Sequence, residues 1–270
     1  MRLAFLADIH GNLPAFEAAL DHAYRQQPDQ IIIVGDIVVG SPDSRACLEL
    51  AQSLSCPIIR GNHERYVASF GQPDAPAAWQ SNQFAPVRWA YDQLTPEQRA
   101  TINGLPQFLR LPDCPDLMIV HASLRNDRDT VYAYTPDDEI AAMFPTAETT
   151  IVRAHNHVPQ VRLWEEQRII TTGSVGLALN LEPTAQYLLL DRVAGEWRIR
   201  HQSVPYDQEQ ALARFDQSGY LEEVGPMARL FMREVATAAG QIVPFLRDYE
   251  RWNATEPITL EAAIQRFLQR

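Results

Sequence analysis

Aspartate, asparagine and histidine residues stand directly after short apolar, β-rich runs at five places in this sequence. These residues are Asp8 and His10, Asp36, Asn62 and His63, His121, and His155 and His157. Each run has the composition of a strand, and stretches with helical spacing separate the first three. In an open α/β sheet the ligand crevice lies at the carboxyl ends of the strands, so side chains distant in sequence converge there. The pattern therefore predicts an α/β chain with one polar site at a sheet edge.

The same runs set the expected order of strands and helices. Strands are expected over 2–7, 30–34, 57–60, 108–111, 117–120, 149–152, 161–164, 169–172, 187–190 and 197–203. Helices are expected over 12–26 and 44–54, and residues 64–104 are expected to be mainly helical. From Gln208 onward the strands end and the apolar residues take helical spacing. We therefore expect an α/β domain over 1–207 and a C-terminal helical extension over 208–270.

The composition excludes several classes of protein. The 270 residues include 23 Lys and Arg against 34 Asp and Glu, which leaves no surplus of positive charge for a nucleic-acid groove. The three cysteines form no Cys-x-x-Cys pair, so neither a disulfide framework nor a thiolate zinc cluster is expected. The first apolar run ends at Asp8, and no run reaches the roughly 20 residues of a membrane span. We expect a cytoplasmic protein without a membrane partner.

Taken one at a time, the five motifs have ordinary structural explanations. An Asp-x-His after a strand and a Gly-Asp are commonly turns, and Asn62 beside His63 can simply cap a helix. His121 alone fits a core or loop histidine, and paired histidines also occur in solvated loops. All five together, in order and with βαβ spacing, indicate a shared site. Oxygen and imidazole donors in such a cluster suit divalent metals such as Mn, Fe or Zn.

Over about residues 1–210 the sequence resembles the calcineurin-like metallophosphoesterase superfamily. The matching blocks are Asp8-Ile9-His10, Gly35-Asp36, Gly61-Asn62-His63-Glu64, His121 and Ala154-His155-Asn156-His157. Blocks typical of the small bacterial and archaeal phosphodiesterase-like or diadenosine tetraphosphatase-like members follow as Val120-His121-Ala122-Ser123, Gly173-Ser174-Val175-Gly176 and Pro205-Tyr206-Asp207. The resemblance implies an α/β/β/α sandwich, in which two mixed β-sheets pack face to face with helices outside. Residues 1–207 would then form the catalytic domain.

Four positions depart from the family pattern. Ala154 replaces the usual glycine before the histidine pair, Asn156 stands where Thr is commoner, Gly40 is slightly displaced, and Thr171-Thr172 replaces Asn-Pro. Ala154 is harmless where its φ is negative and disturbing where it is positive. None of the four positions is a metal ligand in the family.

The resemblance also implies two divalent metal ions, Mn, Fe or Zn, and assigns their ligands. One metal is expected to bind Asp8, His10, Asp36 and His157, and the other Asp36, Asn62, His121 and His155. Asp36 would bridge both, because a carboxylate has two oxygens and can span two neighbouring ions. Two divalent ions outweigh two aspartates in charge, so an acidic protein with this centre still attracts phosphate.

A mechanism follows for a site of this kind. Coordination lowers the pKa of water, so a hydroxide that bridges the metals is the expected nucleophile. His63 is expected to protonate the leaving group, and Glu64 to orient the His63 imidazolium. Arg125 and Arg128 are candidates for binding a second phosphate or the leaving group, although loop arginines are commonly solvated.

The leading interpretation is a dinuclear phosphohydrolase that cleaves phosphate mono- or diesters, with small nucleotides or dinucleoside polyphosphates favoured. One alternative is a protein Ser/Thr phosphatase, because Gly-Asn-His-Glu also occurs there. Another is a non-catalytic scaffold, although such members usually lack the histidine that stands here as His63, or a ligand. Tyr132 and Tyr134 allow either stacking on a base or packing, and packing is favoured.

The C-terminal stretch carries an aromatic stripe with helical spacing. Phe245, Tyr249 and Trp252 fall four and then three residues apart. Such a stripe docks either on the rest of the chain or on a second subunit, so a homodimer is one hypothesis.

Overall fold

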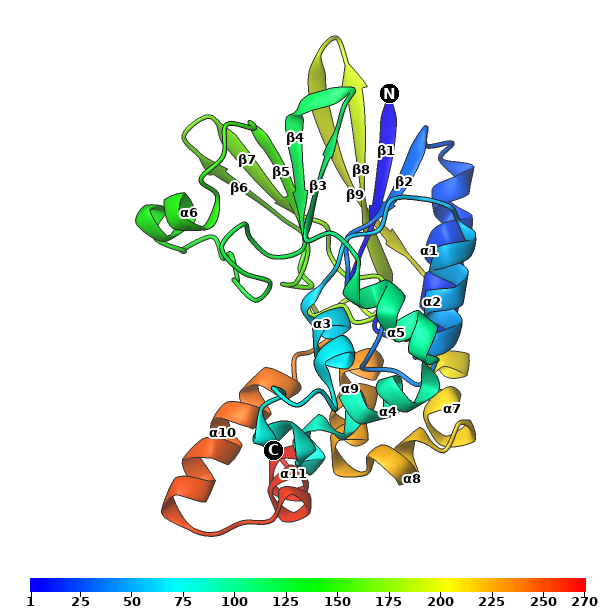
Figure 1. Cartoon of the computed structure of the whole chain (residues 1–270), viewed down its shortest axis with the longest axis vertical. Helices are drawn as coiled ribbons and strands as arrows, with labels where there is room; N and C mark the ends of the chain where they lie inside the picture. Colours follow the sequence, from blue (N-terminus) through cyan, green and yellow to red (C-terminus); the bar gives the residue numbers. More distant parts are fainter.

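Two mixed β-sheets form the upper part of the molecule as drawn in Figure 1, in the computed structural model, which describes all 270 residues. The first sheet has the strand order β2-β1-β8-β9 and the second has the order β3-β4-β5-β7-β6. The strands are β1 (Arg2–Leu6), β2 (Gln30–Ile33), β3 (Phe108–Leu111), β4 (Cys114–Val120), β5 (Thr150–Arg153), β6 (Gln160–Trp164), β7 (Gln167–Thr171), β8 (Ala185–Val193) and β9 (Glu196–Val204).

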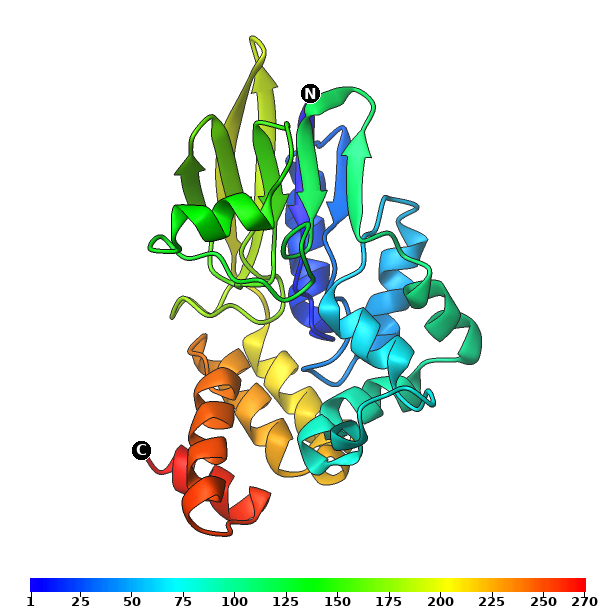
Figure 2. The same ribbon diagram turned by 60° about the vertical axis from the view of Figure 1, so that its left-hand side comes forward.

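Helices cover the outer faces of both sheets and build the lower part of the molecule (Figures 1 and 2). Helices α1 and α2 lie against the first sheet, and α6 lies against the second. The helices are α1 (Leu13–Arg25), α2 (Ser44–Ser53), α3 (Asn62–Ser69), η1 (Ala77–Gln80), η2 (Asn82–Phe84), α4 (Ala85–Gln93), α5 (Pro96–Asn103), α6 (Asp137–Met143), α7 (Gln208–Gln217), α8 (Tyr220–Val224), α9 (Pro226–Thr237), α10 (Ile242–Thr255) and α11 (Leu260–Leu268).

The layers follow from the alternation of side chains along each strand. In β1, Leu3 and Phe5 join the core between the two sheets, whereas Ala4 and Leu6 join the core beneath α1 and α2. Both sets are buried because the sheet is covered on both faces, which explains the continuous apolar runs in the sequence. The α/β/β/α sandwich expected from the sequence is confirmed.

Strand directions bring the polar loops to one end of the sandwich. β1 runs parallel to β2, and β4 runs parallel to β5 in the second sheet. The loops that follow these four strands therefore carry the candidate ligands at their carboxyl ends.

One expected strand is wrong. Residues 57–60 form only a single parallel bridge, from Ile58 to Ile33. The segment is too short to extend the ladder, because Arg60 already donates its backbone N–H to Pro106 and the chain turns at Gly61 into α3.

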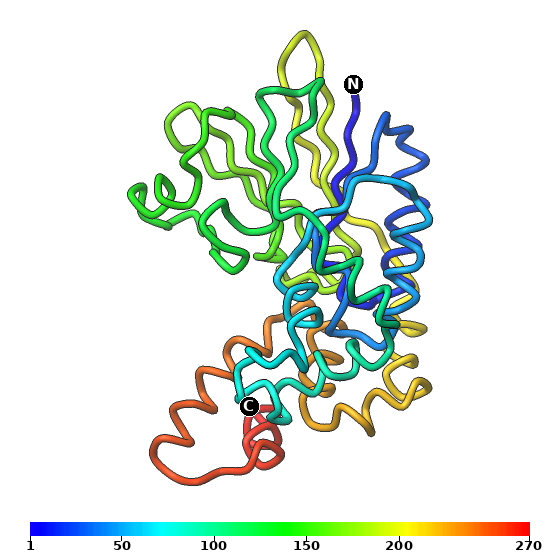
Figure 3. Tube along the Cα trace, viewed as in Figure 1, coloured from blue at the N-terminus to red at the C-terminus, as the bar shows by residue number.

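Helices α7–α11 lie together at the end of the molecule opposite the N-terminus (Figure 3). They share one apolar cluster, in which Phe245 and Trp252 are buried and Phe245 packs edge-on against Phe267 of α11. The aromatic stripe is thus covered largely within the same chain, and a homodimer remains a hypothesis. The division at residue 207 also stays a prediction. None of the helices combines the length and apolar character needed to span a bilayer.

Candidate metal centre

The seven ligand candidates and His63 come together from five separate segments. Asp8 and His10 lie in the loop after β1, Asp36 after β2, Asn62 and His63 at the start of α3, His121 after β4, and His155 and His157 after β5. Their donor atoms fall into overlapping groups whose members lie within 4.8 Å of one another: Asp8 with His10 and His157, His10 with Asp36 and His63, and Asp36 with His121 and His155.

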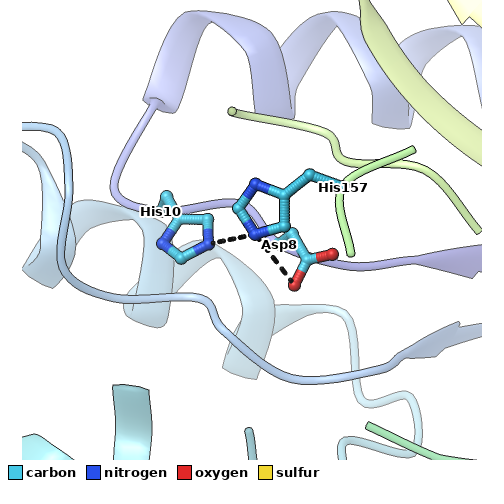
Figure 4. Close-up of side chains that lie close together, drawn as sticks. All are labelled: Asp8, His10 and His157. Atoms are coloured by element: carbon cyan, nitrogen blue, oxygen red, sulfur yellow. Dashed lines mark hydrogen bonds and ion pairs between the residues drawn. The ribbon is translucent and has the colours of Figure 1, made fainter. Parts of the chain in front are cut away.

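The first group is organised around two facing histidines (Figure 4). His10 Nε2 lies 3.1 Å from His157 Nε2, and His157 Nε2 lies 3.7 Å from Asp8 Oδ1. On the far side of each ring, His10 Nδ1 donates to the carbonyl of Val39 at 2.8 Å and His157 Nδ1 donates to that of Leu177 at 2.6 Å. In the tautomer that these contacts favour, the ring proton is on Nδ1 and both Nε2 atoms present lone pairs to each other.

The second group repeats this arrangement around Asp36. His121 Nε2 lies 3.3 Å from Asp36 Oδ2, while its Nδ1 donates to the carbonyl of Val34 at 2.8 Å. The Asn62 amide oxygen lies 3.1 Å from His121 Nε2, and the same amide position is 3.0 Å from His155 Nδ1. An amide nitrogen at that position would donate to these atoms, whereas the oxygen adds another lone pair, which a proton on His121 Nε2 or a cation can satisfy.

Five of the candidates have left-handed backbones. Their φ values are 53° for Asp8, 52° for His10, 54° for Asp36, 69° for His155 and 59° for His157. This conformation costs a non-glycine residue of order 1–3 kcal/mol and persists where the surroundings impose it. Packing around Asp36 is so close that position 61 must be glycine, since a Cβ on Gly61 would lie only 2.1 Å from Asp36 Oδ1.

A divalent cation fits both groups. Asp8 Oδ1 is buried without a hydrogen-bond partner, and the facing lone pairs of the histidines lack any proton between them. Each imidazole ligand candidate is anchored through its other ring nitrogen, as metal-bound histidines usually are. Mixed carboxylate, amide and imidazole donors suit Mn, Fe or Zn.

Burial and close charges shift the pKa values of these groups. Burial raises the pKa of Asp8 to about 6 and lowers the pKa of His155 to about 3. Burial and the nearby His157 hold the pKa of His10 well below its usual range. Burial opposes charge on His121 too, but Asp36 prevails and raises the pKa of His121 to about 10. A proton on His121 and a metal ion are thus alternative sources of positive charge beside Asp36.

His63 lies beside both groups but is held differently. Its Nε2 is 3.9 Å from Asp36 Oδ2, its ring packs edge-on to His10 at 4.8 Å, and its Nδ1 has no partner. It therefore lacks the backbone anchor of the three buried ligand histidines. Its side chain is 21% exposed, so the ring borders solvent. Burial lowers the pKa of His63 below its ordinary value, although Asp36 acts to raise it.

The expectation that Glu64 orients His63 is wrong. Glu64 is fully buried, and no hydrogen bond or ion pair joins its carboxylate to the His63 ring. Its oxygens accept hydrogen bonds at 2.7–2.8 Å from the backbone N–H groups of Asp36, Ile37 and Gly61. Glu64 instead fixes the loop that presents Asp36.

The two candidate arginines lie in different surroundings. Arg125 forms ion pairs at 2.8 Å with Asp129 of its own loop and at 3.0 Å with Glu139 of α6, which neutralise its charge. Arg128 is 66% exposed, and its nearest carboxylate is 3.9 Å away. The backbone carbonyl of Arg128 accepts a hydrogen bond from His155 Nε2 at 3.1 Å. The backbone of Arg128 thus contacts a ligand candidate, and its guanidinium is exposed in a long ion pair with Asp127.

Two residues that the sequence did not single out for a role hold the loop after β4. Arg153 is fully buried and donates to the carbonyls of Ala122 and Asp129, both at 2.7 Å, and to Asn156 Oδ1 at 2.5 Å. Asn156 in turn exchanges hydrogen bonds with both backbone groups of Val131. The only signal in the sequence is an arginine that ends an apolar strand immediately before the histidine pair.

The departures from the family pattern are accommodated. Ala154 is not among the residues with positive φ, so the loss of glycine causes no strain there. Asn156, in place of threonine, makes the hydrogen bonds just described, and Thr171 Oγ1 accepts one from Arg153 at 3.3 Å. Gly40 has a φ of 118° and lies against His10, which requires a glycine.

Comparison with known families agrees with this geometry. The sequence model of the calcineurin-like phosphoesterase family matches residues 1–170. The chain belongs to this family. It is a metal-dependent phosphoester hydrolase, and the expected family and enzyme class are confirmed.

Relatives of this phosphoesterase include proteins from archaea and bacteria. MJ0912 of Methanocaldococcus jannaschii, described as uncharacterized, is 23% identical over 247 residues, which are 85% of this chain and 97% of that protein. A symmetrical bis(5'-nucleosyl)-tetraphosphatase of Chromohalobacter salexigens is 30% identical over 122 residues, 44% of this chain and 43% of that protein.

Solved structures share the fold of this phosphoesterase. A metallophosphoesterase from Sphaerobacter thermophilus is 25% identical with a TM-score of 0.72, over 88% of this chain and 100% of that one. Protein PH1004 from Pyrococcus horikoshii is 21% identical with a TM-score of 0.73, over 89% of this chain and 99% of that one.

Proposed function

We propose that this phosphoesterase works with two divalent metal ions and hydrolyses small phosphate esters, with nucleotides or dinucleoside polyphosphates favoured. The observation that carries the proposal is the pair of donor groups on either side of Asp36. The first ion would be held by Asp8, His10, Asp36 and His157, and the second by Asp36, Asn62, His121 and His155. The candidate ions are Mn, Fe and Zn, and the rate of hydrolysis with each ion in turn distinguishes them.

When bound, the metals lower the pKa of a water so that it can attack phosphorus, and they offset the charge on the phosphate oxygens. The chain itself supplies the proton that the leaving oxygen needs. His63 is suited to that step, because its ring borders both solvent and the donor groups and is not anchored as a ligand. Glu64 and Gly61 hold the Asp36 loop in place, and neither touches substrate.

Substrate selection is assigned to the loop after β4. Arg128 would bind a second phosphate group, because its side chain is exposed, whereas Arg125 is held by its carboxylates. Further along the loop, Tyr132 and Tyr134 stack at 5.2 Å with an interplanar angle of 7°, and their exposed fractions are 43% and 80%. An exposed aromatic pair can be extended by a base, and such stacking is worth about 1–3 kcal/mol. The tetraphosphatase relative also supports a nucleotide.

The test is hydrolysis by purified protein that is stripped of metal and then given Mn²⁺, Fe²⁺ or Zn²⁺ in turn. Substrates are para-nitrophenyl phosphate, bis-para-nitrophenyl phosphate, a dinucleoside tetraphosphate and a phosphopeptide, with Asp36→Asn as the inactive control. We expect metal-dependent turnover that is lost in Asp36→Asn and is fastest with the dinucleotide. Turnover that survives chelation, or that persists in Asp36→Asn, contradicts the dinuclear centre. A preference for a phosphopeptide would indicate a protein phosphatase.

A further inference from the structure

The loop of residues 39–43, called here the 39–43 loop, is in direct contact with the metal-ligand candidate His10. The carbonyl of Val39 accepts the hydrogen bond from His10 Nδ1 at 2.8 Å, and Ser41 donates its backbone N–H to the His10 carbonyl at 2.7 Å. A Cβ on Gly40 would lie 3.1 Å from His10 Cβ. The position of this loop therefore fixes both the orientation of the His10 ring and the tautomer that leaves Nε2 free.

The backbone of the 39–43 loop is in a strained conformation. Val39 has a φ of 68°, which is costly for a β-branched residue, and Gly40 has a φ of 118°. Strained conformations of this kind persist where the surroundings impose them. Val39 donates its backbone N–H to Ser44 Oγ at the start of α2, at 3.0 Å, and the remaining contacts outside the β1 loop come from helices later in the chain.

Helices α7 and α8 supply those contacts. The Tyr220 hydroxyl donates to the Gly40 carbonyl at 3.0 Å, and the Arg214 guanidinium donates to both carboxylate oxygens of Asp43. From the other side, Trp89 of α4 donates to the Pro42 carbonyl at 3.0 Å. In Figure 1, α7 and α8 lie below α1 and beside α4, the helices they pack against.

The Tyr220 ring is itself tightly fixed. It is fully buried, and Trp89 and Phe215 pack edge-on against it with ring centroids 5.3 Å and 5.4 Å away. A phenylalanine would fill this space equally well. A buried hydroxyl is costly unless it is hydrogen-bonded, so the position is explained by its single partner, the Gly40 carbonyl.

We propose that Tyr220 and Arg214 are positioning residues for the metal centre. Through the 39–43 loop they hold His10 in the geometry that binds the first metal ion, so the C-terminal helices complete a site to which they contribute no ligand. This inference rests on the proposed dinuclear centre and extends it to a part of the chain that the family match over 1–170 does not include.

The test compares Tyr220→Phe with Tyr187→Phe in the full chain. Tyr187 is a matched control, because it is also fully buried and its hydroxyl makes one hydrogen bond, to His22 at 2.8 Å, on the α1 side of β8. Each protein is stripped with a chelator and titrated with Mn²⁺ by calorimetry, and its urea midpoint is measured. A His155→Ala background removes a donor of the second site only and isolates the first.

In that background we expect Tyr220→Phe to weaken Mn²⁺ binding about tenfold, within the range found when outer hydrogen-bond partners of ligands are removed. Tyr187→Phe should bind as the parent does, at a similar urea midpoint. Equal Mn²⁺ affinities for all three proteins, or equal losses in both variants, overturn the proposal. Should Tyr220→Phe fail to fold, Arg214→Lys is titrated in its place, because lysine cannot bond both oxygens of Asp43 at once. A parent protein that binds no Mn²⁺ refutes the dinuclear centre instead.

Discussion

His10 and His157 face each other through their Nε2 atoms at 3.1 Å, while the Nδ1 atom of each ring is bound to a backbone carbonyl. No proton lies between the two nitrogens in this tautomer, so their lone pairs repel. The repulsion is built into the fold, because both backbones are left-handed and both rings are anchored. A cation between the rings removes it, and folding and metal binding are therefore coupled.

Removal of the metals should destabilise the protein. A ligand at a hundred times its dissociation constant stabilises the native state by about 2.7 kcal/mol, which for a chain of this size raises the melting temperature by about 5–10 °C. We expect this difference between protein saturated with Mn²⁺ and protein kept in excess chelator, measured by scanning calorimetry. Addition of Mg²⁺, which disfavours imidazole ligands, should restore little of it. Identical melting curves would count against both metal sites.

Replacement of His63 by alanine should impair chemistry and leave metal binding intact. A general acid contributes about 10²–10⁴-fold, and its contribution is largest for leaving groups that are poor without a proton. His63→Ala should therefore lose about that factor with a nucleoside ester and much less with a nitrophenyl ester, whose leaving group is stable as an anion. Metal content is measured by elemental analysis. Loss of one metal ion per chain would instead identify His63 as a ligand.

Replacement of Glu64 by glutamine should affect stability before chemistry. The amide nitrogen of glutamine would replace one carboxylate oxygen and face its backbone N–H donors, either Ile37 at Oε1 or Asp36 and Gly61 at Oε2. Hydrogen bonds to a charged group are worth about 1.5–3 kcal/mol each, so we expect the free energy of unfolding to fall by at least about 2 kcal/mol. Urea unfolding measures it. A variant of normal stability with slow turnover would restore the role expected from the sequence.

The sequence predicts that the ligand candidates converge, and the structure brings them together, because their position depends on strand ends. Asp8, Asp36 and His121 follow apolar runs that become β1, β2 and β4, and parallel strands in each sheet bring such ends together. The run of apolar residues from Leu3 to Leu6 likewise predicts that both faces of β1 are buried. Leu3 and Phe5 lie in one core, and Ala4 and Leu6 lie in the other.

Adjacency in the sequence does not predict which side chains contact each other in the fold. His63 and Glu64 are adjacent, but successive residues of a helix point about 100° apart. Glu64 is the third residue of α3, and its carboxylate folds back to the Gly61 N–H in a capping arrangement. The role of Arg153 depends on burial by the loop after β4, and its long-range partners leave no periodic signal in the sequence.

Replacement of Arg128 or Arg125 by glutamine should have different effects on KM for substrates with two phosphate groups. Arg128 is exposed beside His155, so Arg128→Gln should raise KM for a substrate with two phosphate groups about tenfold and leave the urea midpoint unchanged. That factor corresponds to about 1.4 kcal/mol, close to the lower end of the roughly 1.5–3 kcal/mol of a hydrogen bond to a charged group. Arg125→Gln should instead loosen the loop without a selective effect on such substrates. Steady-state kinetics with para-nitrophenyl phosphate as the reference decides between them, and a matching rise in both KM values would remove Arg128 from the site.

Glu234 in α9 should make the stability of the protein depend on pH. Its side chain is 3% exposed and accepts hydrogen bonds from the backbone N–H groups of Gln241 and Ile242, at the start of α10. Burial raises the pKa of Glu234 to about 7. The native state thus holds its proton to a higher pH than the unfolded chain does. Its contribution to stability is complete below about pH 4.5 and is lost as pH rises through about 7.

Glu234→Gln keeps the acceptor oxygen and cannot ionise, so the variant should match the wild type at pH 5 and exceed it at pH 8.5. The rise in the Glu234 pKa limits the difference in the free energy of unfolding to about 3 kcal/mol, since one pKa unit is about 1.36 kcal/mol. The free energy of unfolding is measured in urea at both pH values on metal-loaded protein, so that titration of the metal centre affects both proteins equally. Glu222→Gln, on the exposed face of α8, is the control and should behave as the wild type does. A constant difference between Glu234→Gln and the wild type across this range would show that Glu234 is ionised throughout, in which case the two N–H groups of α10 stabilise its charge more than burial opposes it.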